Sequence, residues 1–277
     1  MGRSIAELLG ESRLQDSDTP ALDAELLLAH VLGKPRSYLR TWPEREVSEQ
    51  QLERFRVLLE RRRLGEPVAY LLGSQGFWTL DLQVSTDTLI PRPDTERLVE
   101  VALELGPSGP ARVLDLGTGT GAIALALAAE RSQWQLTAVD RMSGVVALAE
   151  ANRRHLNQSN ARFLVSDWFD AVAGEYFDLI VSNPPYIAAD DPHLQQGGVR
   201  FEPASALVSG ADGLDDIRHI IDSAPAHLTA KGWLLLEHGW QQAEAVRQLL
   251  EQRGFSDVQS WRDLGGQQRV SGGRWHA

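Results

Sequence analysis

The chain has 277 residues, of which 43% are hydrophobic and 23% charged, with a formal net charge of −11 and no cysteine. This composition is ordinary for a globular protein of one or two domains, and without cysteines or a His-rich cluster we expect neither disulfides nor a metal site. The acidic balance argues against tight wrapping of nucleic acid, so we expect no direct nucleic-acid binding.

The first residues carry no targeting pattern. Glu7 and Glu11 follow soon after Arg3, which does not fit a signal peptide. The apolar run at residues 122–129 is far too short to span a membrane. We therefore expect no membrane association and a cytoplasmic location.

Residues 1–73 are predicted to form a small helical domain. Leu27, Leu28 and Val31 fall at helical spacing, and Ser48 with Gln51 three residues later is typical of a helix N-terminus. A cluster of arginines follows at the carboxyl end of a predicted helix: Arg54, Arg56, Arg61, Arg62 and Arg63. Cations there complement the helix dipole, so a solvated helix end is favoured over a contact surface for a partner.

A short hairpin is predicted next. In the second half of residues 76–84, apolar and polar side chains alternate with period two. Residues 74–93 are therefore interpreted as a β-hairpin and linker. From residue 94 onward a helix is followed by alternating strands and helices, which indicates an α/β domain over residues 94–277.

A glycine-rich loop follows the first predicted strand of the α/β domain. Residues 113–116 are predicted to form this strand and residues 122–130 a helix. The loop between them consists of Gly117, Thr118, Gly119, Thr120 and Gly121. Glycines allow a ligand to approach the backbone closely, and Asp140, after a second strand at 135–139, is placed to accept hydrogen bonds from ribose hydroxyls.

Two ligand classes fit a glycine loop with a ribose-binding acid. One is a nicotinamide or flavin dinucleotide and the other is S-adenosylmethionine, because both carry an adenosine. The dinucleotide fingerprint is G-x-G-x-x-G, whereas this loop is G-x-G-x-G with Asp115 two residues before its first glycine. A carboxylate there suits an ammonium group better than a pyrophosphate, so S-adenosylmethionine is favoured.

An acidic and an aromatic residue follow the third predicted strand. Asp167 and Trp168 come after the apolar residues 163–165. At such a strand end Asp167 is placed to accept from an exocyclic amine and Trp168 to pack against an adenine ring. For Trp168 taken alone, simple packing in the core or under a lid is the alternative.

The most informative motif follows the fourth predicted strand, residues 178–182. It consists of Asn183, Pro184, Pro185 and Tyr186. Because each proline fixes φ at about −65° and restricts the residue before it, the segment is stiff. The Asn183 oxygen and the Pro184 carbonyl are placed to accept both N–H groups of a planar NH2 group, with the Tyr186 ring stacked beside it. A proline-rich turn without a catalytic role is the alternative.

The remaining chain is predicted to complete the sheet. A helix over residues 217–228 precedes a buried strand at 234–237. Residues 258–260 and 268–275 are predicted to pair as terminal strands.

Together these motifs resemble the bacterial peptide chain release factor glutamine N5-methyltransferases, a family of class I S-adenosylmethionine-dependent enzymes. The resemblance covers essentially the whole chain. Besides the glycine loop and Asn-Pro-Pro-Tyr, it rests on residues 67–70 (Pro-Val-Ala-Tyr), 89–96 (Leu-Ile-Pro-Arg-Pro-Asp-Thr-Glu), 166–169 (Ser-Asp-Trp-Phe), 200–203 (Arg-Phe-Glu-Pro) and 236–239 (Leu-Glu-His-Gly). Adenine methyltransferases have a similar Asn-Pro-Pro-Tyr motif, so the segment at 89–96 and the helical domain make the resemblance specific.

The resemblance implies a Rossmann-like, seven-stranded methyltransferase domain after a helical domain that grips the substrate. The implied reaction is methylation of the glutamine in the Gly-Gly-Gln motif of class I release factors, which act in translation termination. By the family pattern the glycine loop contacts the methionine part of the cofactor, Asp140 the ribose and Trp168 the adenine region. Asn183 and the adjacent proline carbonyl hold the glutamine amide, and Arg92 and Glu96 are expected to shape the mouth of the site.

Three less favoured hypotheses remain. An adenine or guanine amino methyltransferase acting on nucleic acid would share the motifs, but this acidic chain offers no evident basic recognition surface. A noncatalytic protein that binds release factors or the cofactor would not need Asn183. The chain also carries its own Gly265-Gly266-Gln267, which is interpreted as a turn, with self-methylation of Gln267 as the alternative.

Overall fold

The computed structural model describes residues 2–12, 14 and 17–276. The chain divides into two compact units, one of Met1–Ser74 with Gln195–Phe201 and the other of Gln75–Leu194 with Glu202–Ala277. This division differs from the predicted domain limits in two places, because the predicted linker belongs to the second unit and a short segment around Arg200 belongs to the first. The role of the helical unit in substrate binding stays a prediction.

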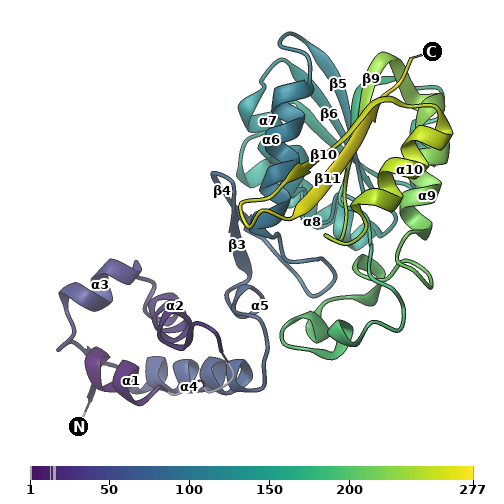
Figure 1. The fold of residues 1–277 in the computed structure, drawn as a ribbon. Helices are drawn as coiled ribbons and strands as arrows, with labels where there is room; N and C mark the ends of the chain where they lie inside the picture. The colour runs from purple at the N-terminus through teal and green to yellow at the C-terminus, as the bar shows by residue number, and fades with distance from the viewer. Residues whose placement is uncertain (1, 13, 15–16, 277) are drawn as a thin grey trace. The chain divides into compact units, whose positions relative to one another are not determined.

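The first unit is built from short helices (Figure 1). They are α1 (Ile5–Glu11), α2 (Pro20–Leu32), α3 (Arg36–Thr41), α4 (Glu49–Arg63) and α5 (Val68–Leu72), accompanied by the paired strands β1 (Arg3–Ser4) and β2 (Glu46–Val47). Ser48 caps α4 as predicted, since its hydroxyl accepts from the Gln51 N–H while the Gln51 side chain accepts from the Ser48 N–H. Leu28 and Phe55 are among the apolar residues that form one buried core in this unit.

The arginine cluster on α4 is largely paired within its own unit. Arg62 donates through Nε to the Asp23 carboxylate at 2.7 Å, and the guanidinium of Arg61 lies 2.5 Å from the Glu66 carboxylate. Arg63 pairs with Glu60 one turn earlier. These ion pairs favour a structural role for the helix end, and contact of the cluster with a partner stays a prediction.

The second unit contains a seven-stranded sheet (Figure 1). Its strands are β5 (Ala111–Leu116), β6 (Trp134–Asp140), β7 (Ala161–Val165), β8 (Phe177–Ser182), β9 (Leu228–Glu237), β10 (Ser256–Arg262) and β11 (Gln268–Arg274). Their order is β10-β11-β9-β8-β5-β6-β7, with β11 antiparallel to both of its neighbours and parallel pairing across β9, β8, β5, β6 and β7. The predicted α/β fold with seven strands is confirmed.

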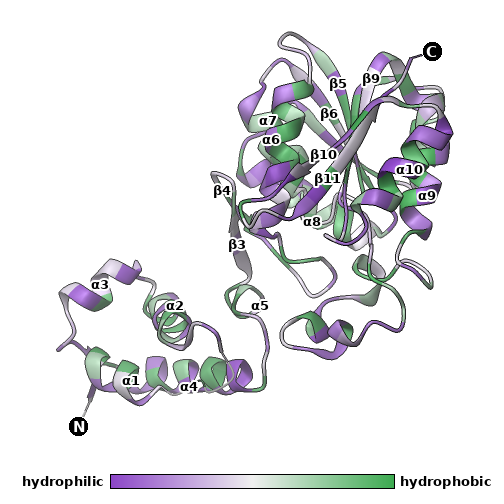
Figure 2. Ribbon diagram, in the orientation of Figure 1, coloured by the Kyte–Doolittle hydropathy of each residue, from purple (hydrophilic) through white to green (hydrophobic). Residues whose placement is uncertain are grey.

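Helices cover both faces of this sheet (Figure 1). They are α6 (Glu96–Leu105), α7 (Ala122–Glu130), α8 (Ser143–His155), α9 (Asp215–Ser223) and α10 (Ala243–Arg253). Because side chains alternate along a strand, Val113 of β5 packs with α6 and α7 whereas Leu114 and Leu116 pack with α9 and α10. Figure 2 shows both hydrophobic and hydrophilic stretches on α9 and α10, as expected for helices that bury one side.

The predicted hairpin consists of β3 (Ser74–Phe77) and β4 (Leu80–Gln83). Phe77 and Leu82 are buried in the same core as α6 and α7, so the hairpin is an integral part of the second unit. Asn152 on α8 fixes it further, because its side chain exchanges two hydrogen bonds with the Gln83 backbone.

One predicted helix is shorter than expected. The sequence predicted a helix over residues 217–228, but α9 ends at Ser223 and the 3-10 turn η6 (Ala224–His227) precedes β9. Pro225 explains the difference, because it lacks an N–H and its ring clashes with the preceding turn of an α-helix.

The remaining 3-10 turns lie in connections: η1 (Pro93–Thr95), η2 (Asp170–Val172), η3 (Pro192–Gln195), η4 (Val199–Phe201) and η5 (Ala204–Ala206). Among the described residues, no helix has the length and apolar character needed to cross a membrane.

Candidate active site

A cavity lies at the edge of the sheet where β5, β6, β7 and β8 end. This is the place where the strand order reverses direction, and open α/β sheets bind ligands at such a point. The structure brings nine predicted site residues together in its lining: Gly117, Thr118, Gly119, Thr120, Asp140, Asp167, Trp168, Asn183 and Pro185. The other four predicted site residues are not among the lining residues: Asp115, Gly121, Pro184 and Tyr186.

The glycine loop adopts a backbone conformation that favours glycine. Gly117, Gly119 and Gly121 have φ values of 68°, 55° and 84°. A Cβ atom on Gly121 would lie 3.0 Å from the Leu125 side chain and 3.2 Å from the Phe163 ring, so this glycine also permits close packing. The loop is thereby held against β7 and α7, with its other two glycines open to a ligand.

Asp115 lies on β5 beneath this loop and is fully buried. The Thr118 hydroxyl donates to one carboxylate oxygen, Oδ2, at 2.7 Å, and the other oxygen, Oδ1, is buried as well. Burial raises the pKa of Asp115 to about 7, an effect that hydrogen bonds from the Thr118 hydroxyl and the Ala124 N–H oppose and that nearby Asp140 reinforces. A cation placed at the loop would stabilise the ionised form.

Asp140 connects the end of β6 to the loop. Its Oδ2 atom accepts from the Gly119 N–H at 3.2 Å and its Oδ1 atom from the Met142 N–H at 3.1 Å. These bonds hold the carboxylate at the cavity while leaving lone pairs for a ligand. Asp167 is exposed on the lining, and the half-buried Trp168 ring lies 3.7 Å from the position that a Cβ on Gly117 would take.

Asn183 presents a free acceptor at the cavity. Its Nδ2 group donates to the Thr95 hydroxyl at 3.2 Å. Its Oδ1 atom is buried and has no hydrogen-bond partner among the described residues. A buried acceptor without a donor is costly, so this oxygen is suited to receive an N–H group from a ligand.

Tyr186 is held behind this acceptor rather than in the lining. Its hydroxyl donates to the Glu237 carboxylate at 3.4 Å, and its ring packs against the core on the α9 and α10 side. Burial, with Glu237 as the next cause, raises the pKa of Tyr186, so its hydroxyl stays protonated. Stacking of this ring on a substrate stays a prediction.

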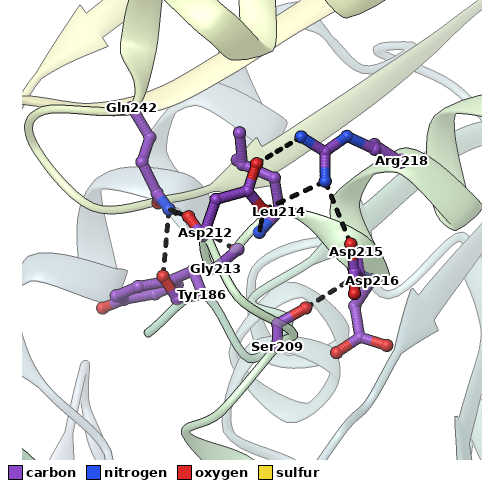
Figure 3. A network of polar contacts seen from close by, with 9 residues as sticks. All are labelled: Tyr186, Ser209, Asp212, Gly213, Leu214, Asp215, Asp216, Arg218 and Gln242. Carbon is purple, nitrogen blue, oxygen red and sulfur yellow. Dashed lines mark hydrogen bonds and ion pairs between the residues drawn. The ribbon is translucent and has the colours of Figure 1, made fainter. Parts of the chain in front are cut away.

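A polar network fixes the backbone of the motif (Figure 3). The Gln242 amide donates to the Tyr186 carbonyl at 3.0 Å and accepts from the Gly239 N–H at 2.8 Å, which joins the motif to the end of β9. Gly213 lies so close that a Cβ there would be 2.3 Å from the Tyr186 carbonyl oxygen. Figure 3 also shows Arg218 bridging Asp212 and Asp215, which orders the loop that carries Gly213.

Sequence patterns did not identify several residues that organise the site. The Thr95 hydroxyl accepts a hydrogen bond from the Asn183 NH2 group, and the Glu237 carboxylate accepts one from the Tyr186 hydroxyl. The buried Glu202 pairs with Arg92, which lines the cavity, and also accepts from the Ile90 N–H at 3.1 Å. The family-like segments at 89–96, 200–203 and 236–239 were the available signal, although they did not indicate which residues contact one another.

Glu96 differs from its expected place at the mouth of the site. Its carboxylate accepts from the Trp78 N–H at 2.8 Å, and Glu96 is absent from the described cavity lining. Glu96 therefore supports the hairpin, whereas Arg92 does lie at the cavity as expected.

The chain's own Gly-Gly-Gln forms the turn between β10 and β11, as predicted. Gly266 has a φ of 79°, and the Gln267 N–H donates to the Asp263 carboxylate at 2.8 Å. The Gln267 residue is exposed. Its methylation by this chain stays a hypothesis, and an unchanged intact mass after incubation with S-adenosylmethionine would refute it.

Comparison with known proteins identifies both parts of the chain. Residues 8–73 match the model of the PrmC N-terminal domain and residues 96–205 that of the methyltransferase small domain. The release factor glutamine methyltransferase of Pseudomonas aeruginosa is 60% identical over 272 residues, which span 98% of this chain and 99% of the relative. The chain belongs to the release factor glutamine methyltransferase family.

Further comparisons agree with this membership. The release factor glutamine methyltransferase of Escherichia coli is 54% identical over 265 residues, which span 96% of each chain. A solved methyltransferase from Pyrococcus furiosus matches 79% of this chain and 98% of its own with a TM-score of 0.55 and 18% identity, which shows the shared fold. The chain is thus an enzyme of the methyltransferase class.

Proposed function

We propose that this enzyme transfers the methyl group of S-adenosylmethionine to the side-chain amide nitrogen, N5, of the glutamine in the Gly-Gly-Gln motif of class I release factors. The names of relatives that are 54% and 60% identical support this substrate class. The observation that carries the proposal is the buried Asn183 Oδ1 atom, which has no partner among the described residues and belongs to a residue that lines the cavity beside the glycine loop.

The residues present fit S-adenosylmethionine. The glycine loop and Asp140 provide open backbone and a carboxylate for the methionine part and the ribose, while Asp167 and Trp168 provide an acceptor and a ring for the adenine. The buried Asp115 carboxylate beside the loop would favour an ammonium group there through its charge. When bound, the cofactor supplies a methyl group activated by a sulfonium.

Asn183 and Pro184 supply the acceptors for the substrate amide. The Asn183 oxygen would accept one N–H and the Pro184 carbonyl the other, which would fix the plane of the substrate amide. A carboxamide nitrogen is a poor nucleophile because its lone pair is delocalised into the carbonyl. In-line positioning therefore has to supply much of the rate, and it can contribute about 7 to 11 kcal/mol.

The proton leaves after the methyl transfer. The methylated amide is a strong acid while it carries the extra proton, so the Asn183 oxygen or water can receive that proton without a dedicated base. His238 does not serve as this base, because it is buried against the Ser271 hydroxyl at 2.7 Å and burial lowers its pKa to about 4.

The direct test is transfer of labelled methyl to a purified class I release factor. A release factor with Gln→Asn in its Gly-Gly-Gln motif is the control, and RNA and DNA are offered in parallel. We expect label on the intact factor alone. Label on nucleic acid alone would instead establish the base-methyltransferase alternative and refute the prediction that the chain does not bind nucleic acid.

A further inference from the structure

A buried hydrogen-bond chain leads away from the free oxygen of Asn183. The Asn183 NH2 group donates to the Thr95 hydroxyl at 3.2 Å, and the Thr95 hydroxyl lies near enough to the Glu237 carboxylate to help lower the pKa of that carboxyl. Tyr186 donates to the same carboxylate at 3.4 Å. Glu237 is 1% exposed and stands at the last position of β9, immediately behind the Asn-Pro-Pro-Tyr motif.

We propose that Glu237 is a positioning residue that fixes the direction of this hydrogen-bond chain, so that Asn183 turns its oxygen and not its NH2 group toward the substrate. The inference rests on the proposed function, because only a substrate NH2 group needs an acceptor at this place. It extends that function to Thr95 and Glu237, neither of which lies in the Asn-Pro-Pro-Tyr motif.

The direction follows from the donors and acceptors available. An ionised carboxylate only accepts, so the charge of Glu237 favours the orientation in which the single hydrogen of the Thr95 hydroxyl points toward Glu237. The hydroxyl lone pairs are then left to accept from the Asn183 NH2 group, and the Asn183 oxygen remains free for the cavity. A donor in place of the carboxylate would let Thr95 point its hydrogen at Asn183, and the amide would turn its NH2 group toward the substrate NH2.

The charged surroundings of Glu237 allow this direction to depend on pH. Burial raises the pKa of Glu237 to about 7, the Thr95 hydrogen bond and Arg269 on β11 oppose this rise, and Asp94 on η1 reinforces it. Arg269 is itself shared between Asp94 at 3.5 Å and Asp263 at 3.2 Å. The carboxyl is thus an acceptor above pH 7 and gains a donor hydrogen as the pH falls below it.

Glu237→Gln tests the inference, because it keeps the shape and introduces a donor. We expect kcat to fall by about 10- to 100-fold with the dissociation constant for S-adenosylmethionine unchanged, since a misplaced reacting group costs about this much. At saturating cofactor, kcat/KM of the wild type for the release factor should fall as the pH drops through about 7, and this fall should be absent from the variant.

Thr95 provides an independent variant of the same chain. Thr95→Val should reduce kcat to the same extent, Thr95→Ser should restore most of the loss, and Thr95→Val combined with Glu237→Gln should be no worse than either alone. Asp115→Asn is the matched control, because it replaces the other fully buried carboxyl with a raised pKa. It should weaken cofactor binding and leave the pH profile at saturating cofactor unchanged.

The outcomes separate the inference from the proposed function. A wild type that methylates the release factor, with Glu237→Gln equal to it in kcat and pH profile, would overturn the inference alone. So would strictly additive losses in the double variant, or a Glu237→Gln protein that loses cofactor binding as much as turnover. A wild type that transfers no methyl to the release factor would overturn both.

Discussion

Two fully buried carboxyls flank the strand that carries Asn183. Asp115 lies on β5 and Glu237 on β9, and β8 runs between these two strands. Burial raises the pKa of each to about 7, and hydrogen bonds oppose this rise, from Thr118 and the Ala124 N–H at Asp115 and from Thr95 and Tyr186 at Glu237. Their neighbours differ, because Asp140 disfavours the ionised form of Asp115 whereas Arg269 favours that of Glu237.

This difference indicates two uses of a buried carboxyl in one site. Asp115 has a negative neighbour, Asp140, so its ionised form gains most from an incoming cation near the glycine loop. Glu237 already has hydroxyl donors and a positive neighbour, so its task is to hold other side chains in place. We call the glycine loop, Asp115 and Asp140 the cofactor half of the cavity, and Asn183 with Thr95, Tyr186 and Glu237 its substrate half, after the roles proposed above. Changes in the two halves should impair different steps.

The largest effect on turnover is expected from a change at Asn183, in the substrate half of the cavity. Asn183→Ala removes the free acceptor, and we expect turnover to fall by about 100- to 1,000-fold, as for the loss of one preorganised hydrogen-bonding group. Cofactor affinity should stay close to that of the wild type. Titration calorimetry and single-turnover kinetics measure the two quantities, and equal losses in both would show that Asn183 does not hold the substrate amide.

The raised pKa values of Asp115 and Glu237 should make the stability of the protein depend on pH. Each folded-state pKa is raised from an ordinary value of 3.8 or 4.5 to about 7, so the folded chain holds a proton that the unfolded chain has lost. This contribution to stability is full below pH 4 and is lost as the pH rises through 7. Ionisation of each carboxyl in the folded chain should therefore lower the free energy of unfolding by about 3 to 4 kcal/mol above pH 7.

Asp115→Asn and Glu237→Gln should therefore be more stable than the wild type at pH 8 and similar to it near pH 4. Urea unfolding at the two pH values measures this. Adding S-adenosylmethionine sharpens the comparison, because the cation should remove the advantage of Asp115→Asn and preserve that of Glu237→Gln. An advantage that is the same at both pH values would refute the raised pKa as its cause.

Asp140→Ala should affect only the cofactor half. Hydrogen bonds to charged groups contribute about 1.5 to 3 kcal/mol, so we expect affinity for S-adenosylmethionine to weaken by about 10- to 100-fold. At saturating cofactor, kcat should change little. Titration calorimetry that gives an unchanged dissociation constant would count against a ribose contact.

The sequence predicted which residues lie around the glycine loop better than it predicted which residues contact Asn183 and Tyr186. The glycine loop, Asp115 and Asp140 belong to adjacent strand ends with a recognisable spacing, and the structure places them around one cavity. Thr95 is 88 residues from Asn183, and Glu237 is 51 residues from Tyr186. Contacts between residues so far apart in the sequence depend on how helices and strands pack. The spacing of hydrophobic residues along the chain, which predicts single helices and strands, does not predict such contacts.

Two predictions from the sequence were wrong in detail, one on the end of a helix and one on the contact that Glu96 makes. Pro225 could have shown that the helix from residue 217 ends before 228, because proline disrupts a helix interior. Glu96 belongs to a family-like segment, yet only the folded chain shows that its carboxylate binds the Trp78 N–H and not a ligand. Membership of a motif therefore predicted proximity to the site more reliably than it predicted the contact made.

The smallest effect concerns the backbone behind the substrate half. Gly213 and Gly174 both have a φ of 77°, but a Cβ on Gly213 would meet the Tyr186 carbonyl at 2.3 Å whereas one on Gly174 would meet nothing within 4 Å. Both Gly→Ala variants should lose about 1 to 2 kcal/mol of stability through backbone strain, and Gly213→Ala should lose more, because its Cβ clashes with the Tyr186 backbone. Gly213→Ala alone should also lower kcat, by about 10-fold, because it displaces the motif.

Gly174→Ala is thus a matched control for strain without contact. Urea unfolding and kcat at saturating cofactor, measured for both variants, separate the two effects. Equal kcat values would mean that the motif tolerates movement of the Tyr186 carbonyl, and the preorganisation assigned to the Gln242 network would then be wrong. A selective loss in Gly213→Ala with unchanged cofactor affinity would extend the substrate half of the site to the loop that carries Gly213.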